Sequence, residues 1–585
     1  SSHFGSSDTT PRPAQVGTRT LRAMKFGKEL ECSALPKFRG FYIQYKELKK
    51  ALKVFTGQER NQSTVQEATH WTSSFLRLGP NPEVPPEAKL NDILVSELDR
   101  VSKFTELQED ALRSQLDRLG EDARKEDADR ETLLQRLDDL GDQLVHLKTF
   151  SRLNFTGFRK ILKKYDKWSN STVMPWFMGK VMRAPLMTVD YEGLLLRLNR
   201  AAASLRPDDA GSASSASRAA QASSGPGSSE AASELTFFVH PKDTMWVRVQ
   251  LAKHLRLTGA AEAPEPPAAA ASAAAAAVDL PRPQQPRTTC VFLDTPSLSV
   301  YAAHAIGVRS AGAEAGGPAA AAPPRAAWHL RHQGGEAVSL VGTAPGTPVH
   351  GEVVLTCAEV SRLLLGEDVG APSDPRAAAL AAVARAAREE GMRPIAQASY
   401  HRSAHHEAGG LITATVDENV KMAQVSQWDG PTALPEFFPY NLLRISFPRD
   451  PQASEELPRW LRRIQDSAYV FQVSGFTKAA HTMARFRAKE LGLPEPHWYR
   501  SVVDSKAMAE DEQQEQPEAT APPQQPEPEQ PMPRLTSDGQ SRGRPRACTG
   551  ERLLHEFGPD ATEPAQARSP ASAAETAPAP AADGG

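Results

Sequence analysis

The spacing of hydrophobic residues changes once along the chain, near residue 233, and this change constrains the fold more than any other feature. Over residues 24–168, and again over 187–205, apolar residues recur at steps of three and four, the period of amphipathic helices. After residue 233 they form short runs rich in β-branched and aromatic types, such as TTCVFLDT and FPYNLLRISF, which are typical of strands. The sequence therefore predicts an α+β multidomain protein in which an all-α helical bundle precedes an antiparallel β domain.

The helical part contains three long patterns of this kind. The segment FYIQYKELKKALKVF has apolar residues at 41, 45, 48, 52 and 55, a second pattern begins at Leu90, and a third begins at Leu133. Long helices joined by short or polar connections usually pack side by side, so these patterns predict an antiparallel bundle with coiled-coil-like spacing. Residues 187–205 predict one more helix.

The part after residue 233 has many short strands and few helices over a long span. This combination predicts a closed or strongly curved sheet, a β tunnel or barrel, with flanking helices at 241–255 and 374–391. Inserts rich in Pro and Ala, at 259–286 and 310–326, are expected to form loops outside the core of this domain.

The domain boundaries follow from changes in composition. A chain of 585 residues is too long for one hydrophobic core, so two or more domains are expected. The predicted segments are a disordered leader at 1–23, the helical domain at 24–175, a helix with a Ser/Ala-rich linker at 176–232, the β domain at 233–500, and a disordered tail at 501–585 that is rich in Gln, Glu, Pro and Ala.

Charge and composition exclude several classes of protein. Lys and Arg number 68 against 71 Asp and Glu, which gives a net charge of −3, so the whole chain is not a polycation of the nucleic-acid-binding type. The four cysteines lack CxxC spacing, which argues against a zinc site or a disulfide framework and fits a reducing compartment. No apolar run reaches the roughly 18–20 residues that span a bilayer, so no transmembrane segment is predicted. The chain does not begin with Met, and Met24 is a candidate start unless the sequence is a fragment.

Two lysine stripes are the candidate binding feature. Lysines stand at positions i, i+3, i+4 and i+7 on two predicted helices, which places each set on one helix face: Lys46, Lys49, Lys50 and Lys53 on the first, and Lys160, Lys163, Lys164 and Lys167 on the second. Two such faces in one bundle can converge on a polyanion. A plain solvated face explains the spacing equally well. Nucleic acid is a weaker candidate, because no aromatic residues alternate with the exposed lysines.

Three motifs in the helical part resemble the SPX domain family: MKFGKEL from Met24, YIQYKELKKALK from Tyr42 and NFTGFRKILKKYDK from Asn154. The resemblance covers about 24–168 and implies binding of inositol pyrophosphates, by which SPX domains sense phosphate status. The implied ligand-binding residues are Tyr45, Lys49 and Lys164, the adjoining Lys160, Lys163 and Lys167, and Lys25 near the start of the domain. Tyr45 also lies on the apolar seam of its helix and could belong to the core instead.

The part after residue 233 resembles the VTC domain, the polyphosphate polymerase module of vacuolar transporter chaperone complexes. The motifs that carry this resemblance are FFVHP, VFLDTPSLSVY, ASYHRSA, VDENV, FPYNLLRISF and FTKAAH. The resemblance implies a triphosphate tunnel fold, in which an antiparallel barrel encloses a basic channel. An SPX domain followed by a VTC domain is a recurrent arrangement.

This sequence lacks most of the catalytic groups that the resemblance would require. Arg331, Arg402 and Lys478 match cations of the family's tunnel, whereas His329 replaces another arginine. Arg444 stands where the family has a metal-binding glutamate, which reverses the charge there, and Ser446 stands in place of a lysine.

A divalent cation needs carboxylate ligands, so no metal site and no catalytic residue is predicted for this domain. Glu418 and Glu436 can be named as replacements for the missing glutamate, but nothing in their spacing supports either one. The dipeptide His240-Pro and the segment HHEAGG are interpreted as a family motif and a loop turn, rather than as metal sites.

Together these features predict a phosphate-sensing accessory subunit of a VTC-type polyphosphate polymerase complex, involved in phosphate homeostasis. Expected partners are inositol pyrophosphates, polyphosphate as a further candidate ligand, and membrane-embedded VTC subunits, because the family's usual C-terminal membrane domain is not in this sequence. The expected location is cytoplasmic, on the cytosolic face of the vacuole or acidocalcisome. One alternative is an active polyphosphate polymerase that uses ATP and manganese at a rearranged site. Another is a soluble SPX sensor that binds a different regulator, with the barrel as a scaffold.

Overall fold

A computed structural model describes the helical part and the sheet, with gaps. The described residues are 25–58, 61–76, 86–125, 129–170, 172–206, 233–257, 287–312, 327–333, 335, 337–343, 351–369, 376–407, 412–430, 434–447, 457–500 and 502. The predicted leader, the Ser/Ala-rich linker from residue 207, the insert at 259–286, residues 313–326 of the second insert and the tail from residue 503 lie outside these residues.

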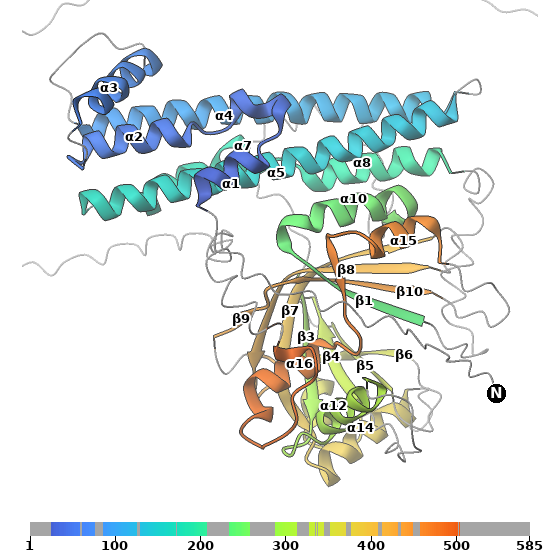
Figure 1. Cartoon of the computed structure of the whole chain (residues 1–585). Coiled ribbons are helices and arrows are strands. Elements are labelled where there is room, and N and C mark those ends of the chain that lie inside the picture. Colours follow the sequence, from blue (N-terminus) through green and yellow to red (C-terminus); the bar gives the residue numbers. More distant parts are fainter. Residues whose placement is uncertain are drawn as a thin grey trace, which may run out of the picture. The chain divides into compact units, whose positions relative to one another are not determined.

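The N-terminal part is helical, as predicted (Figure 1). Its elements are α1 (Phe26–Ser33), η1 (Pro36–Phe41), α2 (Tyr45–Phe55), α3 (Gln62–Leu76), α4 (Pro86–Asp122), α5 (Arg130–Ser169), α6 (Val173–Arg183), α7 (Pro185–Thr188) and α8 (Tyr191–Ser204). The two longest, α4 and α5, have 37 and 40 residues and correspond to the second and third apolar patterns.

Helix α5 has defined signals at both ends and a close packing point in its middle. The side chain of Asp129 accepts a hydrogen bond from the backbone N–H of Glu131, and Asn170 ends the helix in the left-handed conformation with φ 54°. At Gly157 an added Cβ atom would lie 2.6 Å from Cγ2 of Ile43, so only glycine allows the segment before α2 to pack this closely on α5.

The C-terminal part is an antiparallel sheet with flanking helices, as predicted, and its strands differ in length. Its strands are β1 (Ser233–Val239), β2 (Arg256–Leu257), β3 (Arg287–Asp294), β4 (Ala327–His332), β5 (Ala337–Thr343), β6 (Gly351–Thr356), β7 (Arg393–His406), β8 (Thr413–Gln424), β9 (Glu436–Phe437), β10 (Asn441–Phe447) and β11 (Val470–Gln472). The order across the sheet is β11-β1-β10-β8-β7-β3-β4-β5-β6, with β2 beside β7 and β9 beside β8. Among the described strands β11 and β6 are unpaired edges, so the described sheet is open rather than closed by hydrogen bonds.

Helices cover one face of this sheet on both sides of β7. Helices α10 (Thr244–His254) and α15 (Arg459–Gln465) pack on β1, β8 and β10, whereas α13 (Cys357–Leu364) and α14 (Ala377–Glu389) pack on β3, β4, β5 and β6. The helices predicted at 241–255 and 374–391 are thereby confirmed as α10 and α14. On the opposite face, α12 (Ser299–Gly312), α16 (Lys478–Met483) and η4 (Ala484–Ala488) cover an apolar area around Tyr400.

Helix α10 belongs to two hydrophobic cores at once. Met245, Val249 and Ala252 pack with leucines of α4, α5 and α8, whereas its other face packs against the sheet through Val247 and Leu251. The sequence of α10, TMWVRVQLAKH, shows no polar stripe, which is expected for a helix that is buried on both sides. The helical part and the sheet therefore share a continuous core, although the sequence pattern changes between them.

Ion pairs extend this shared core. Arg248 of α10 donates to both carboxylate oxygens of Glu192 in α8, at 2.5 and 2.6 Å, and Lys253 of α10 donates to Asp138 of α5 at 2.7 Å. Only 5% of Arg248 and 8% of Lys253 is exposed, so both charges need these partners. No helix in the described ranges is long and apolar enough to cross a bilayer.

Candidate functional site: a lysine cluster between two helices

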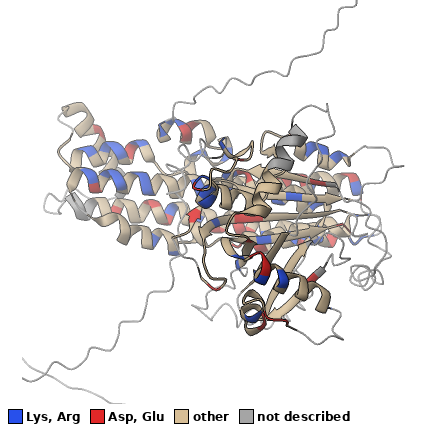
Figure 2. Cartoon of the chain, turned by 90° about the horizontal axis from the view of Figure 1, so that it is seen from below, with Lys and Arg blue, Asp and Glu red and all other residues tan. Residues whose placement is uncertain are grey.

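Four lysines from the two predicted stripes converge where α2 packs on α5. Leu48 and Leu52 of α2 lie in one hydrophobic core with Phe158, Ile161 and Leu162 of α5, which brings the two lysine faces together. The pKa of Lys164 is lowered, first by partial burial and then by the positive charges of Lys49, Lys160 and Lys167. We call these four residues, Lys49, Lys160, Lys164 and Lys167, the lysine cluster. Figure 2 shows Lys and Arg positions side by side on neighbouring helices of this part.

Two other lysines of the first stripe already have carboxylate partners. Lys46 pairs with Glu31 of α1, and the ammonium group of Lys50 lies 3.4 Å from Glu47 and 3.5 Å from Glu67. Lys49 is the member of this stripe that faces the lysines of α5. Two lysines of this stripe thus form ion pairs within the fold, whereas Lys49 belongs to the lysine cluster.

Three further residues from the prediction lie around the cluster. Lys163 is exposed on α5, next to Lys164. Lys25 directly precedes Phe26, the first residue of α1. Because the ring of Phe26 lies 5.3 Å from Nζ of Lys160, the backbone of Lys25 lies near the cluster. Tyr45 is only 7% exposed and its ring packs edge-on against Phe26 at 4.8 Å. Packing in the core thus explains why an aromatic residue stands at position 45. Contact between the hydroxyl group of Tyr45 and a ligand stays a prediction.

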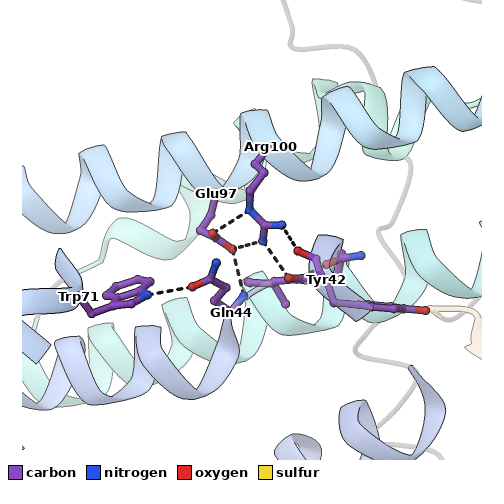
Figure 3. Close-up of polar contacts among 8 residues, drawn as sticks. Tyr42, Gln44, Trp71, Glu97 and Arg100 are labelled. Atoms are coloured by element: carbon purple, nitrogen blue, oxygen red, sulfur yellow. Dashed lines mark hydrogen bonds and ion pairs between the residues drawn. The ribbon is translucent and has the colours of Figure 1, made fainter. Parts of the chain in front are cut away.

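A buried polar network holds the segment that precedes α2 (Figure 3). Glu97 of α4 is fully buried, accepts a hydrogen bond from the backbone N–H of Gln44 at 3.0 Å, and pairs with Arg100 at 2.9 Å. Arg100 in turn donates to the backbone carbonyls of Gly40 and Tyr42, and Trp71 donates to the side chain of Gln44. This network fixes the start of α2, and with it the position of Lys49.

Asn154 of α5 completes the attachment of this segment. Its Oδ1 accepts a hydrogen bond from the backbone N–H of Ile43 at 2.7 Å, and its Nδ2 donates to the carbonyl of Phe150. Asn154 is fully buried one turn before Phe158 on α5. Sequence analysis assigned no role to Glu97, Arg100 or Asn154. A charged or amide residue within the apolar stripe of a long helix is the signal that could have revealed them.

A groove of about 700 Å³ lies between α1 and the start of α2. Its lining combines apolar residues such as Leu30 and Ile43 with Arg39, Glu31 and Glu47. Because its lining mixes positive and negative charge, the groove suits a polyanion less well than the lysine cluster does.

The three predicted cations of the β domain lie on the sheet face opposite α10, α13 and α14. Side chains alternate along strands, so this face carries a group of charged and hydroxyl residues, which we call the polar face: Glu234, Thr236, His329, Arg331, Glu352, Arg402, Thr415, Asp417, Arg444 and Ser446, with Lys478 contributed by α16. The burial of the alternate residues on β1, β8 and β10 against α10 supports this assignment.

Asp417 binds two of these cations. Arg402 donates to its two oxygens at 2.7 and 2.9 Å, and Nζ of Lys478 lies 2.5 Å from Oδ2. Both cations also lie over the ring of Tyr400, at 5.0 and 4.4 Å. Burial alone would raise the pKa of Asp417, but the charge of Lys478 and the hydrogen bonds from Arg402 outweigh it and lower this pKa to about 2. Asp417 is therefore ionised whenever the protein is folded at ordinary pH.

The remaining cations have carboxylate partners too. Arg331 of β4 pairs with Glu352 of β6, and Arg444 of β10 pairs with Glu234 of β1 at 2.9 Å. Burial, and then the charges of Arg331, Lys478, Arg402 and Arg444, lower the pKa of His329 to about 4. Because all four cations lower the pKa of this one histidine, they lie around a common region of the polar face. Sequence analysis predicted the cations but none of these carboxylate partners.

The candidate replacements for the missing metal ligand are engaged elsewhere. Glu418 lies 3.3 Å from Arg248, and Glu436 accepts from Arg485 at 3.0 Å. In the described part of the chain, no group of three His, Cys, Asp or Glu residues is arranged to hold a metal ion. The interpretation of HHEAGG as a loop turn is wrong for its two histidines, because His405 and His406 end strand β7 and pair with β2. His240 caps η3 (Pro241–Asp243) by accepting from the N–H of Lys242.

Comparisons with known proteins find relatives that match parts of this chain. Subunit 2 of the vacuolar transporter chaperone complex of Toxoplasma gondii is 31% identical over 311 residues, which cover 31% of this chain and 24% of the relative. SPX domain-containing protein 2 of Arabidopsis thaliana is 30% identical over 176 residues, 28% of this chain and 60% of the relative. SPX domain-containing protein 1 of Oryza sativa subsp. indica is 32% identical over 177 residues, with the same two shares. The chain thus spans less than two thirds of each of these relatives.

One solved structure is the SPX domain of Chaetomium thermophilum Glycerophosphodiester Phosphodiesterase 1 in complex with inositol hexakisphosphate; it is 26% identical and covers 31% of this chain and 99% of its own, with a TM-score of 0.25. The model of the SPX domain family matches residues 127–181, which include all of α5 and most of α6. The helical part of this chain therefore contains an SPX domain.

Proposed function

We propose that the helical part binds a highly phosphorylated inositol, with inositol pyrophosphates as the preferred class, at the lysine cluster. The observation that carries this proposal is the convergence of Lys49 with Lys160, Lys164 and Lys167 at one place, where they lower the pKa of Lys164. Like charges at this spacing destabilise a helix, and a polyanionic ligand would turn their repulsion into attraction. Lys163 and Lys25 stand beside the cluster and extend the basic surface.

The ligand class follows from the chemistry of the cluster. Ammonium groups act as point charges that bind phosphate oxygens without demanding one geometry, and several of them on one surface favour a compact ligand with many phosphate groups. Each charge-assisted hydrogen bond contributes about 1.5–3 kcal/mol in favourable settings, and micromolar affinity corresponds to roughly 8 kcal/mol. Three or four such contacts are therefore sufficient for a sensor that works at micromolar ligand.

We infer further that the chain is a regulatory subunit of a VTC-type complex that couples phosphate status to polyphosphate synthesis. The similarity to subunit 2 of the Toxoplasma complex and the order of the two parts support this. The ion pairs of Arg331, Arg402, Arg444 and Lys478 on the polar face support a regulatory rather than a catalytic β domain. On this proposal the chain works with membrane-embedded subunits at the cytosolic face of a vacuole or acidocalcisome.

Calorimetric titration with an inositol pyrophosphate tests the binding proposal. The full chain is compared with the triple variant Lys49→Ala, Lys160→Ala, Lys164→Ala, and with a control that carries Lys103→Ala, Lys242→Ala and Lys489→Ala at three exposed lysines outside the cluster. The cluster variant should lose at least tenfold in affinity while the control binds as the native chain does. Both variants should remain folded, since surface substitutions usually change stability by about 0.5 kcal/mol or less. Equal affinity of a folded cluster variant and the native chain would refute the proposal.

A further inference from the structure

Helix α6 carries the most exposed of the chain's eight tryptophans. Trp176 is 57% exposed, whereas the next residue, Phe177, is fully buried and packs in one core with Phe158 of α5. Lys180 and Arg183 stand four and seven residues after Trp176, so the three side chains share the outer face of α6. The ammonium group of Lys180 lies 4.1 Å from the centre of the Trp176 ring. The outer face of α6 thus combines an exposed aromatic ring with two cations.

Further apolar side chains accompany Trp176 on α6 and on α7, which follows it. They are only partly buried and pack against the helical core from its outer side: Val173, Met174, Met178, Met182, Ala184 and Met187. Methionine side chains are flexible and polarisable, so they adapt to a partner of irregular or changing shape. Exposed apolar surface that is bordered by polar residues marks a contact with a partner protein or a membrane. We call Trp176, Lys180 and Arg183, together with these side chains, the Trp176 face.

The charge of this segment has one sign. Residues 167–189 include three cations but no Asp or Glu. The preceding residue, Asp166, accepts hydrogen bonds from the backbone N–H groups of Val173 and Met174, at 3.0 Å each, and so fixes the start of α6 beside the end of α5. Lys167 is exposed on this last turn of α5 and adds to the positive charge. The Trp176 face therefore attracts a negatively charged partner.

An anionic lipid surface fits this face better than a folded protein does. Tryptophan favours the boundary between headgroups and acyl chains, where its ring is buried and its N–H group stays hydrated. Basic side chains beside it are attracted to anionic headgroups. Protein surfaces usually mix both signs of charge, and their cations would find no carboxylate among residues 167–189. A fluid lipid surface, in contrast, is uniformly negative and needs no complementary shape.

We propose that the Trp176 face docks on anionic lipid bilayers, with the Trp176 ring in the headgroup layer and Lys180 and Arg183 on the anionic headgroups. The contact uses residues outside the lysine cluster, so it does not depend on inositol phosphate binding. It also gives the chain a lipid contact of its own, beyond any membrane-embedded subunit that it joins. Because α6 starts at the end of α5 that carries the lysine cluster, docking holds this cluster close to the membrane surface.

Sedimentation of the full chain with lipid vesicles tests the proposal. Vesicles of phosphatidylcholine alone are compared with vesicles of equal parts of phosphatidylcholine and phosphatidylserine. All chains carry Lys49→Ala, Lys160→Ala and Lys164→Ala, so that the lysine cluster contributes little to vesicle binding. In this background Trp176→Ala is compared with Leu365→Ala, which removes an apolar side chain that is 77% exposed at the end of α13.

A second pair of variants tests the contribution of charge. The double variant Lys180→Ala, Arg183→Ala removes two cations of the Trp176 face and leaves Trp176 in place. Its matched control, Lys242→Ala with Lys489→Ala, removes two exposed lysines of the β domain. The two pairs act on different groups, so poor folding of one face variant leaves the other as a valid test.

The background chain should bind the mixed vesicles about tenfold more tightly than the phosphatidylcholine vesicles, and added salt should weaken this binding. Trp176→Ala and the double variant Lys180→Ala, Arg183→Ala should each weaken binding to the mixed vesicles by about tenfold, while both controls bind as the background chain does. A background chain that does not bind the mixed vesicles would overturn the proposal, and so would equal binding by the face variants and their controls. Self-association that depends on Trp176, without vesicle binding, would also overturn it and assign the face to a second copy of the chain.

Discussion

Asp417 shows how a single residue determines what the β domain can do. Its carboxylate is buried, and it holds Arg402 and Lys478 at distances of 2.5–2.9 Å. Breaking a buried ion pair by removing one partner is far more costly than the pair's net contribution to stability, because the remaining charge has lost both water and its partner. Asp417 is thus a structural residue, and its carboxylate pairs with two cations of the polar face.

We predict that Asp417→Asn lowers the free energy of unfolding by about 3–5 kcal/mol, since it leaves the buried Lys478 and the partly buried Arg402 without a counter-charge. Denaturant titration measures the loss, and Glu490→Gln, which removes an exposed carboxylate, should leave the midpoint nearly unchanged. The folded-state pKa of Asp417, about 2, lies below its ordinary value near 3.9, so its contribution is present above pH 4 and lost as pH falls from about 4 to about 2. The native chain and the variant should therefore converge in stability over that range. An equally large difference at pH 2 and pH 7 would contradict this account.

At the residue scale, the sequence could identify the cations but not their partners. Lysine spacing on a helix is local, so Lys160, Lys164 and Lys167 could be placed on one face from the sequence alone. The pairs Arg444–Glu234 and Arg331–Glu352 depend on the register of strands that are distant in sequence, which no local pattern encodes. For the same reason the sequence did not reveal the roles of Glu97 and Asn154, whose hydrogen-bond partners lie 53 and 111 residues away in the sequence.

At the scale of elements, helix α5 is the part that joins structure to proposed function. Its C-terminal half carries three lysines of the cluster, its buried Asn154 holds the segment before α2, and its N-terminal half contacts α10 through Asp138. Its long apolar period and its capping Asp129 made it predictable from the sequence. In contrast, the role of α10 was not predictable, because a helix without a polar stripe does not reveal which two layers it will join.

We predict that Asn154→Ala costs about 1–3 kcal/mol of stability, because the buried backbone N–H of Ile43 loses its acceptor. The substitution should also weaken binding of an inositol pyrophosphate, since the start of α2 and thus Lys49 would lose its fixed position. Denaturant titration and calorimetry measure the two effects. Thr149→Ala is the matched control: it removes a side-chain hydrogen bond on the same helix that stays within α5, to the carbonyl of Val145. Native-like stability of the Asn154→Ala chain would contradict the role given to this residue.

At the scale of the whole molecule, the shared core around α10 makes the helical part dependent on the β domain. Met245, Val249 and Ala252 complete a core that also contains leucines of α8. A fragment of residues 25–206 lacks these side chains, so amides of α8 should exchange hydrogen faster in the fragment than in the full chain. Amides of α2, which lies in a different hydrophobic cluster, provide the internal control and should exchange alike in both. Equal protection of α8 in fragment and full chain would show that the helical part folds independently.

We propose different tasks for the two charged regions of the molecule. In the lysine cluster the charges of Lys49, Lys160 and Lys167 lower the pKa of Lys164, an arrangement that suits a compact polyanion, whereas the cations of the polar face pair with carboxylates of the same face. Both regions are rich in cations, and composition alone would have treated them alike. The distinction comes from where carboxylates lie in the folded chain, which is why the structure was needed to make it.

The pKa of Lys164 with and without ligand, measured by NMR on reductively ¹³C-methylated lysines, tests the lysine cluster as a binding site. We predict that Lys164 titrates below the ordinary lysine pKa of about 10.4, because it is partly buried and close to three other ammonium groups. We also predict that inositol hexakisphosphate raises the pKa of Lys164, since nearby phosphate groups favour the charged amine. A Lys164 that titrates at the ordinary lysine pKa and does not respond to the ligand would contradict the existence of a lysine cluster that binds inositol phosphates.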